Sequence, residues 1–147
     1  MKKIAFLLVL MLVGFATHLY YVFRPIEGID VSETAVSLQS TTEKYEYHRH
    51  LRLLLSDQDP EDLRYLINVR CDGEGAYEHG KTLVQALIKL GDTAFSGMTS
   101  KLNKTETQTL LTFMTAGHEY GNFSAFPELE EFKRRFPLTF KSLSGKV

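Results

Sequence analysis

The sequence predicts an all-α protein, with an N-terminal transmembrane helix followed by a compact bundle or short superhelix of about six helices. An uninterrupted apolar run covers residues 4–23, helix start and stop signals recur from residue 40 onward, and no segment has convincing strand character. The 147 residues suffice for one domain of ordinary size. We expect a signal-anchor segment at 1–24, a tether at 25–39 and an exported helical domain at 40–147.

The membrane segment is defined by its composition and by its flanks. Residues 4–23 contain no Asp, Glu, Lys or Arg, and as a helix they match a hydrocarbon layer of about 30 Å. Lys2 and Lys3, with the terminal amine, outweigh Arg24 in positive charge. The positive-inside rule therefore predicts a cytoplasmic N-terminus and an extracytoplasmic domain, either periplasmic or extracellular.

A cleaved signal peptide is the alternative for the same segment. Residues 4–13 would form its apolar core, and cleavage near Ala16 would secrete the rest of the chain. The apolar run continues to Phe23, so cleavage would leave an aromatic N-terminus on a soluble protein. We therefore favour the uncleaved anchor, with residues 4–23 in contact with the membrane.

The segment 25–39 lacks sustained periodicity and contains Pro25 and Gly28, which favours a tether. The alternative is that its apolar side chains lie across the surface of the domain. These side chains are Ile29, Val31, Val36 and Leu38.

Charge and cysteine content exclude several classes of protein. Beyond Arg24 the chain has 14 basic and 18 acidic residues, a net charge of −4. This mild acidity suits solubility rather than binding of nucleic acid or anionic lipid. The single cysteine excludes an internal disulfide framework.

Helix start signals after residue 40 account for the predicted bundle. Residues 40–43 and 103–106 have the capping-box pattern, and Asp59 before Pro60 suits a helix start. Residues 76–90 have the strongest helical periodicity. The six helices are expected to begin near Ser40, Asp59, Ala76, Asp92, Asn103 and Pro127.

A basic run, residues 48–52, lies on the first of these helices. We expect it to form a solvated face of the helix. The alternatives are a pH sensor and a contact for an acidic partner.

The most concentrated polar cluster is found at residues 71–80. Carboxylates and imidazoles bind divalent metals and transfer protons, so the cluster is a candidate ligand or catalytic site. The alternative is a glycine-rich turn between two helices, together with partly buried histidines that form ordinary hydrogen bonds. The candidate ligands are Asp72, Glu74, Glu78, His79 and the more distant His118, with Cys71 as a candidate thiol.

The sequence contains no recognisable catalytic motif and no phosphate-binding loop. We therefore expect a non-enzymatic module without a cofactor, which binds a protein of the cell envelope and no nucleic acid. The alternative is a small metal-binding or hydrolytic domain that uses residues 71–80 and a divalent metal. Convergence of the candidate ligands on one concave pocket would favour this alternative.

Overall fold

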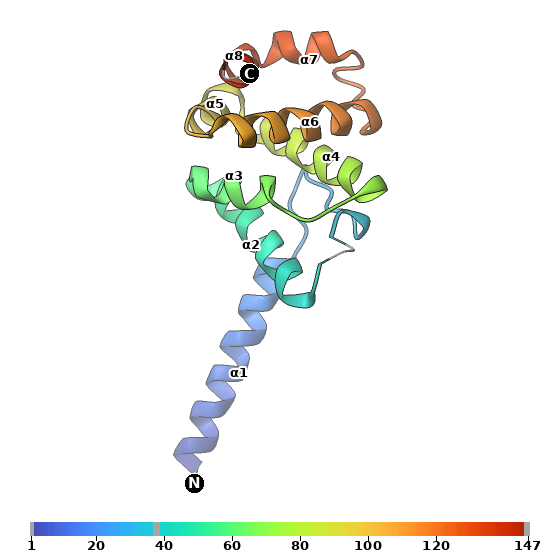
Figure 1. Cartoon of the computed structure of the whole chain (residues 1–147). Coiled ribbons are helices and arrows are strands. Elements are labelled where there is room, and N and C mark those ends of the chain that lie inside the picture. The colour runs from blue at the N-terminus through green and yellow to red at the C-terminus, as the bar shows by residue number, and fades with distance from the viewer. Residues whose placement is uncertain (1, 37–38, 146–147) are drawn as a thin grey trace.

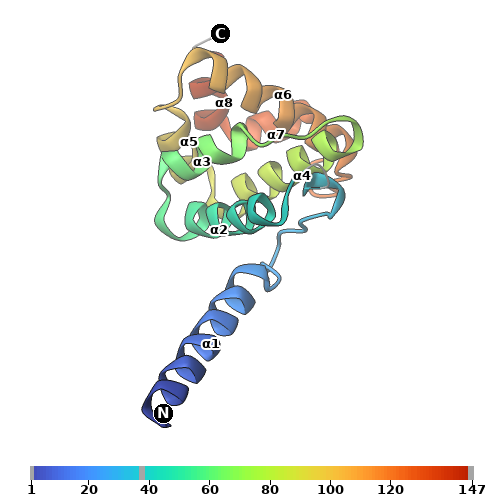
Figure 2. The same ribbon diagram turned by 60° about the horizontal axis from the view of Figure 1, so that its bottom comes forward.

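The computed structural model describes residues 2–36 and 39–145, and its first helix stands apart from the others. Helix α1 (Lys2–Phe23) projects as a rod from the end of a helical domain (Figures 1 and 2). Within the described ranges the chain forms helices and connecting segments and no β-strand, which confirms the predicted all-α fold class.

The described part of the domain contains seven α-helices and one short 3₁₀ helix, close to the predicted number of about six. The predicted caps are present: Ser40 and Asn103 each form a capping box, and the Asp59 side chain accepts from the Glu61 amide. The elements are η1 (Thr34–Val36), α2 (Thr41–Asp57), α3 (Pro60–Ile67), α4 (Gly73–Leu90), α5 (Asp92–Thr99), α6 (Lys104–Tyr120), α7 (Leu129–Arg135) and α8 (Pro137–Ser144).

The additional helix is α8, which begins directly after the predicted last helix. Pro137 disfavours helical geometry at the preceding residue, and Phe136 has φ −122° and ψ 56°. Helix α8 then starts with Pro137 at its first turn, and Asp92 accepts hydrogen bonds from the amides of Leu138 and Thr139 at 2.9 and 2.8 Å. A helix begins at Asp92 as expected, but the Asp92 side chain joins the start of α5 to the start of α8 and does not cap its own helix.

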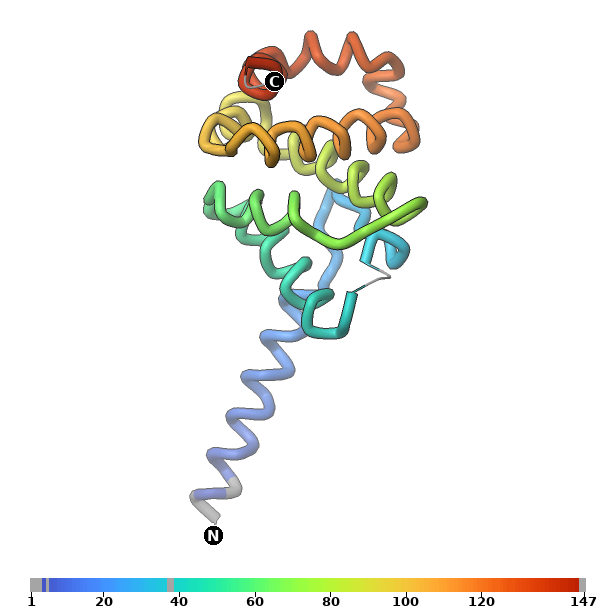
Figure 3. The backbone as a smooth tube through the Cα atoms, in the orientation of Figure 1, coloured from blue at the N-terminus to red at the C-terminus, as the bar shows by residue number. Residues whose placement is uncertain are grey.

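Helix α4 occupies the middle of the domain, and α6 crosses it at very short range (Figure 3). At the crossing, Gly80 and Gly117 bring the two backbones together. A Cβ atom on Gly117 would lie 2.0 Å from the carbonyl carbon of Gly80, so only glycine permits this approach. On its other side α4 packs against η1 and α2.

The described residues of the segment 25–39 lie across the domain. This is the arrangement given above as the alternative to a tether. Ile29 and Val36 are buried in the hydrophobic core. Asp30 forms an ion pair with Lys81 of α4 at 3.0 Å, and its amide donates to the Gln85 side chain at 2.9 Å. Leu38 lies outside the described residues. The domain therefore sits directly beside the end of α1.

Candidate functional site

The surface of α1 is apolar along its length. Residues 6–23 are long and apolar enough to cross a membrane, although a signal sequence has the same properties. Among the large apolar side chains, Leu8 is 51% exposed and Leu12 is 67% exposed, so the helical domain leaves them uncovered.

His79 is fully buried between α2 and α6. Its Nδ1 lies 3.0 Å from the hydroxyl of Tyr47, and its ring packs edge-on against Phe113 with centroids 4.8 Å apart. Burial lowers the pKa of His79 to about 4, and the nearby Leu66 backbone acts in the opposite direction. Its Nε2 is buried without a hydrogen-bond partner among the described residues. The imidazole is therefore a neutral core group.

His118 faces a different layer of the domain. Its Nε2 lies 2.8 Å from the carbonyl oxygen of Phe126, and its ring stacks on Phe132 with centroids 5.0 Å apart. Helices α4 and α6, which carry the two histidines, pack on each other, but their imidazoles have separate partners. His79 and His118 therefore do not form a joint site.

The other candidates in the 71–80 cluster do not converge either. Asp72 and Glu74 are exposed, and Glu78 pairs with Lys81 of its own helix at 3.5 Å. Burial raises the pKa of Cys71 to about 11, so its thiol stays protonated at neutral pH. Among the described residues, no three His, Cys, Asp or Glu side chains are placed to hold a metal ion. The concave pocket that would favour the metal or hydrolase alternative is not formed by these residues.

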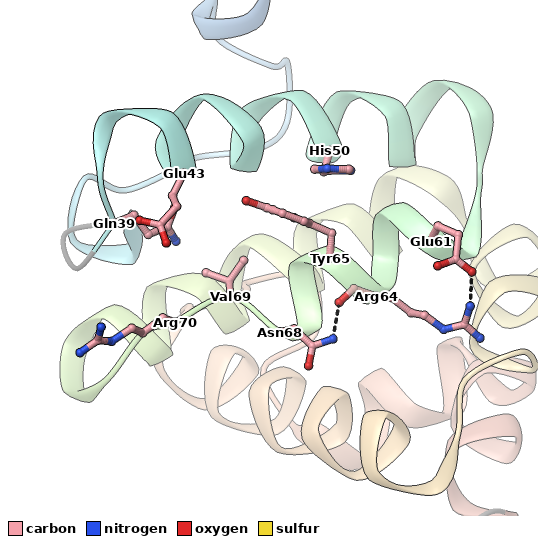
Figure 4. Close-up of a pocket in the computed structure, with 9 residues that line it drawn as sticks. All are labelled: Gln39, Glu43, His50, Glu61, Arg64, Tyr65, Asn68, Val69 and Arg70. Carbon is pink, nitrogen blue, oxygen red and sulfur yellow. Dashed lines mark hydrogen bonds and ion pairs between the residues drawn. The ribbon is translucent and has the colours of Figure 1, made fainter.

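A hollow in the described structure lies elsewhere, between α2, α3 and the connection to α4 (Figure 4). Its volume is about 580 Å³. The ring of His50 projects from α2 and stacks on Tyr65 of α3, with centroids 3.9 Å apart. The remainder is lined by Val69 and by charged and polar side chains: Gln39, Glu43, Glu61, Arg64, Asn68 and Arg70.

His50 is held between two carboxylates. Its Nδ1 lies 2.6 Å from Oδ1 of the buried Asp62, and its Nε2 lies 3.6 Å from Oε2 of Glu46. Such an arrangement fixes the orientation of the ring. The residues that line this hollow include no serine, threonine or cysteine, and Tyr65 supplies the one hydroxyl among them.

The His50–Asp62 pair is not evident in the sequence because the two residues belong to different sequence patterns. Asp62 lies in the first turn of a helix, where acids are common, and His50 belongs to the basic run 48–52. Only the antiparallel packing of α2 on α3 brings the two together. Asp62 is an acidic residue that falls on the buried face of its helix, and this position is the sequence signal that could have revealed the pair.

The contact predicts that Asp62→Asn lowers the free energy of unfolding by about 2 kcal/mol at pH 7, because the substitution weakens a partly buried hydrogen bond to a carboxylate. Glu61→Gln is the matched control in the same turn, since Glu61 is exposed and pairs with Arg64. Its expected cost is below about 1 kcal/mol. Urea unfolding of both variants measures the difference, and equal costs would contradict the role of the pair.

No protein-family model, curated protein or solved structure matches this chain. The function is therefore argued from the chain's own residues.

Proposed function

We propose that this is a single-pass membrane protein with a cytoplasmic N-terminus, whose extracytoplasmic domain binds another protein of the cell envelope. The observation that supports anchoring is the exposed apolar surface of α1, which projects from the domain (Figure 1). Soluble monomers rarely expose continuous apolar surface on this scale, and a bilayer covers it. The charge difference between Lys2 with Lys3 and Arg24 supports the orientation.

A pair of exposed tyrosines is the surface that we assign to the protein partner. Tyr77 of α4 and Tyr120 of α6 stack with ring centroids 4.1 Å apart, and they are 38% and 60% exposed. Exposed tyrosines of limited conformational freedom are frequent energetic centres of protein interfaces. The neighbouring Glu74 and Glu119 are exposed as well, which favours a partner segment with basic side chains.

One experiment on the full chain tests both parts of the proposal. A photo-crosslinking amino acid replaces Tyr120, and the same amino acid at the exposed Leu138 of α8 serves as the control. Cells are irradiated, and membranes are isolated and washed with alkaline carbonate. We expect the washed membranes to retain the uncleaved chain. We also expect the cross-linker at position 120 to give a discrete product with one other protein, and the cross-linker at position 138 to give no such product.

Two outcomes contradict the proposal separately. A soluble mature chain that starts at Thr17 would contradict anchoring, and the intact mass of the purified protein measures this directly. Equal cross-linking from positions 120 and 138 would contradict the tyrosine surface. The alternative metal-binding or hydrolytic function gains no support from the described residues, since its candidate ligands do not meet.

A further inference from the structure

The last turns of α1 pack against α2 instead of ending in a free linker. The ring of His18 contacts the hydroxyl of Tyr45, and the ring of Phe23 lies 5.1 Å from that of His48. Val22 is buried at this junction, and its carbonyl oxygen accepts a hydrogen bond from Nε of Arg52 at 2.9 Å. Helix α2 is thereby fixed beside the C-terminal end of α1, as Figure 2 shows.

This packing determines the level of α2 relative to a bilayer spanned by α1. His18 precedes Phe23 by five residues, which corresponds to about 7.5 Å along a helix. The headgroup region on each side of the hydrocarbon layer is about 5–8 Å deep. Because residues 4–23 match the hydrocarbon layer, Arg24 lies at the level of the lipid headgroups when α1 spans the membrane, and so does Arg52, which donates to the carbonyl oxygens of Val22 and Arg24. Tyr45, which contacts His18, lies deeper, beside the last turns of α1 within the membrane. The face of α2 that carries Tyr45 and Arg52 therefore faces the bilayer.

That face of α2 is basic and aromatic. At 100° per residue, the side chains of Tyr45, His48, Arg49 and Arg52 fall within an arc of about 100°. The three acids of the helix fall in a separate arc, and one of them, Glu46, contacts His50. These acids are Glu43, Glu46 and Asp57. The domain is acidic as a whole, but its membrane-facing helix face is positive.

Two guanidinium groups at this face lack an acidic partner. The Cζ atoms of Arg24 and Arg52 lie 4.8 and 5.2 Å from the ring centroid of Tyr21. In the described part of the chain, no carboxylate lies within ion-pair distance of either group, although Arg52 donates to the carbonyl oxygens of Val22 and Arg24. Burial, followed by the charge of Arg24, lowers the pKa of Arg52. An anion placed between the two groups would relieve their repulsion.

We propose that the surface formed by Arg24, Arg49 and Arg52 binds the phosphate groups of anionic phospholipids in the membrane that α1 spans. The inference rests on the proposed membrane anchoring and adds a lipid class and an orientation to it. Arg49 pairs with Glu46 at 2.9 Å, but both side chains are partly exposed, so a headgroup phosphate competes with this pair. The bound lipid holds this face of α2 at the bilayer surface and directs the opposite end of the domain, with α7, away from it (Figure 1).

The test uses the full chain in phosphatidylcholine vesicles with a trace of chain-spin-labelled lipid. The measured quantity is the association of labelled phosphatidylglycerol relative to labelled phosphatidylcholine. Arg24→Gln/Arg49→Gln is compared with Arg134→Gln/Arg135→Gln, which removes two exposed charges from α7 at the far end of the domain. We expect the preference for phosphatidylglycerol to fall about fivefold for each arginine removed from the α2 surface and to remain unchanged in the α7 variant.

The outcomes separate this inference from the anchoring that it depends on. A chain that resists carbonate extraction but has no preference for phosphatidylglycerol overturns the lipid surface and leaves the anchor intact. A chain extracted by carbonate overturns the anchor itself. An equal loss of preference in both double variants would show a general effect of net charge and would also overturn the assigned surface. Competition by free inorganic phosphate at millimolar concentration would indicate an anion site without lipid selectivity, which contradicts the proposal.

Discussion

Gly117→Ala is expected to lower the free energy of unfolding of the domain by at least about 3 kcal/mol. The new Cβ atom would lie 2.0 Å from the carbonyl carbon of Gly80 and 2.2 Å from the amide nitrogen of Lys81. Both contacts are with backbone atoms, so no side-chain rotation relieves them and the helices α4 and α6 must separate. This separation disturbs the centre of the core, since α4 packs on several other elements as well.

The sign of this prediction is decided by the clash and not by helix propensity. Alanine is favoured over glycine inside a helix by about 1 kcal/mol, which by itself would stabilise the variant. Gly97→Ala on α5 isolates this propensity effect, because nothing lies within 4 Å of a Cβ at that position. We expect Gly97→Ala to be neutral or stabilising.

Urea unfolding of the full chain in neutral detergent, followed by far-ultraviolet circular dichroism, measures both glycine variants. A detergent micelle keeps α1 covered, so the transition reports the domain. If the stabilities of Gly117→Ala and Gly97→Ala agree within about 1 kcal/mol, the close crossing of α4 and α6 is contradicted.

The parts of the fold that sequence analysis predicted correctly depend on local chemistry. The capping boxes at Ser40 and Asn103 and the cap at Asp59 are decided within four residues, and the structure has helices at each of them. The apolar periodicity of residues 76–90 likewise belongs to one helix, α4, which has more buried residues than its neighbours because it lies at the centre.

The parts that were missed depend on contacts between distant segments. Nothing near Asp92 in sequence indicates that its carboxylate accepts from the amides that begin α8. The hydrogen bonds of Asp30 to α4 similarly join residues more than 50 positions apart. The candidate site at residues 71–80 was selected because its polar residues are close in sequence. On a helix such residues point in different directions, and here they have separate partners.

The buried His79 is expected to make the stability of the domain depend on pH between about 4 and 6.5. Its environment is made of Tyr47, Phe113 and Leu66, and no charged group contacts the ring among the described residues. Burial lowers the folded-state pKa to about 4, whereas an unfolded histidine titrates near 6.5. The unfolded chain therefore binds the proton first as the pH falls.

The sign of the effect follows from this order of protonation. Stability contributed by neutral His79 is fully present above pH 6.5 and is lost as the pH falls toward 4, by about 2.5 kcal/mol between pH 7.5 and 4.5. In the variant His79→Gln, the side chain at position 79 cannot be protonated but can still form a hydrogen bond with Tyr47. The free energy of unfolding of the wild type minus that of the variant should fall by the same amount between these two pH values. The effects of the carboxylates cancel in this difference because both proteins contain them. A constant difference in urea unfolding free energy at the two pH values would show that His79 is protonated in the folded state, and the dry core position assigned to it would then be wrong.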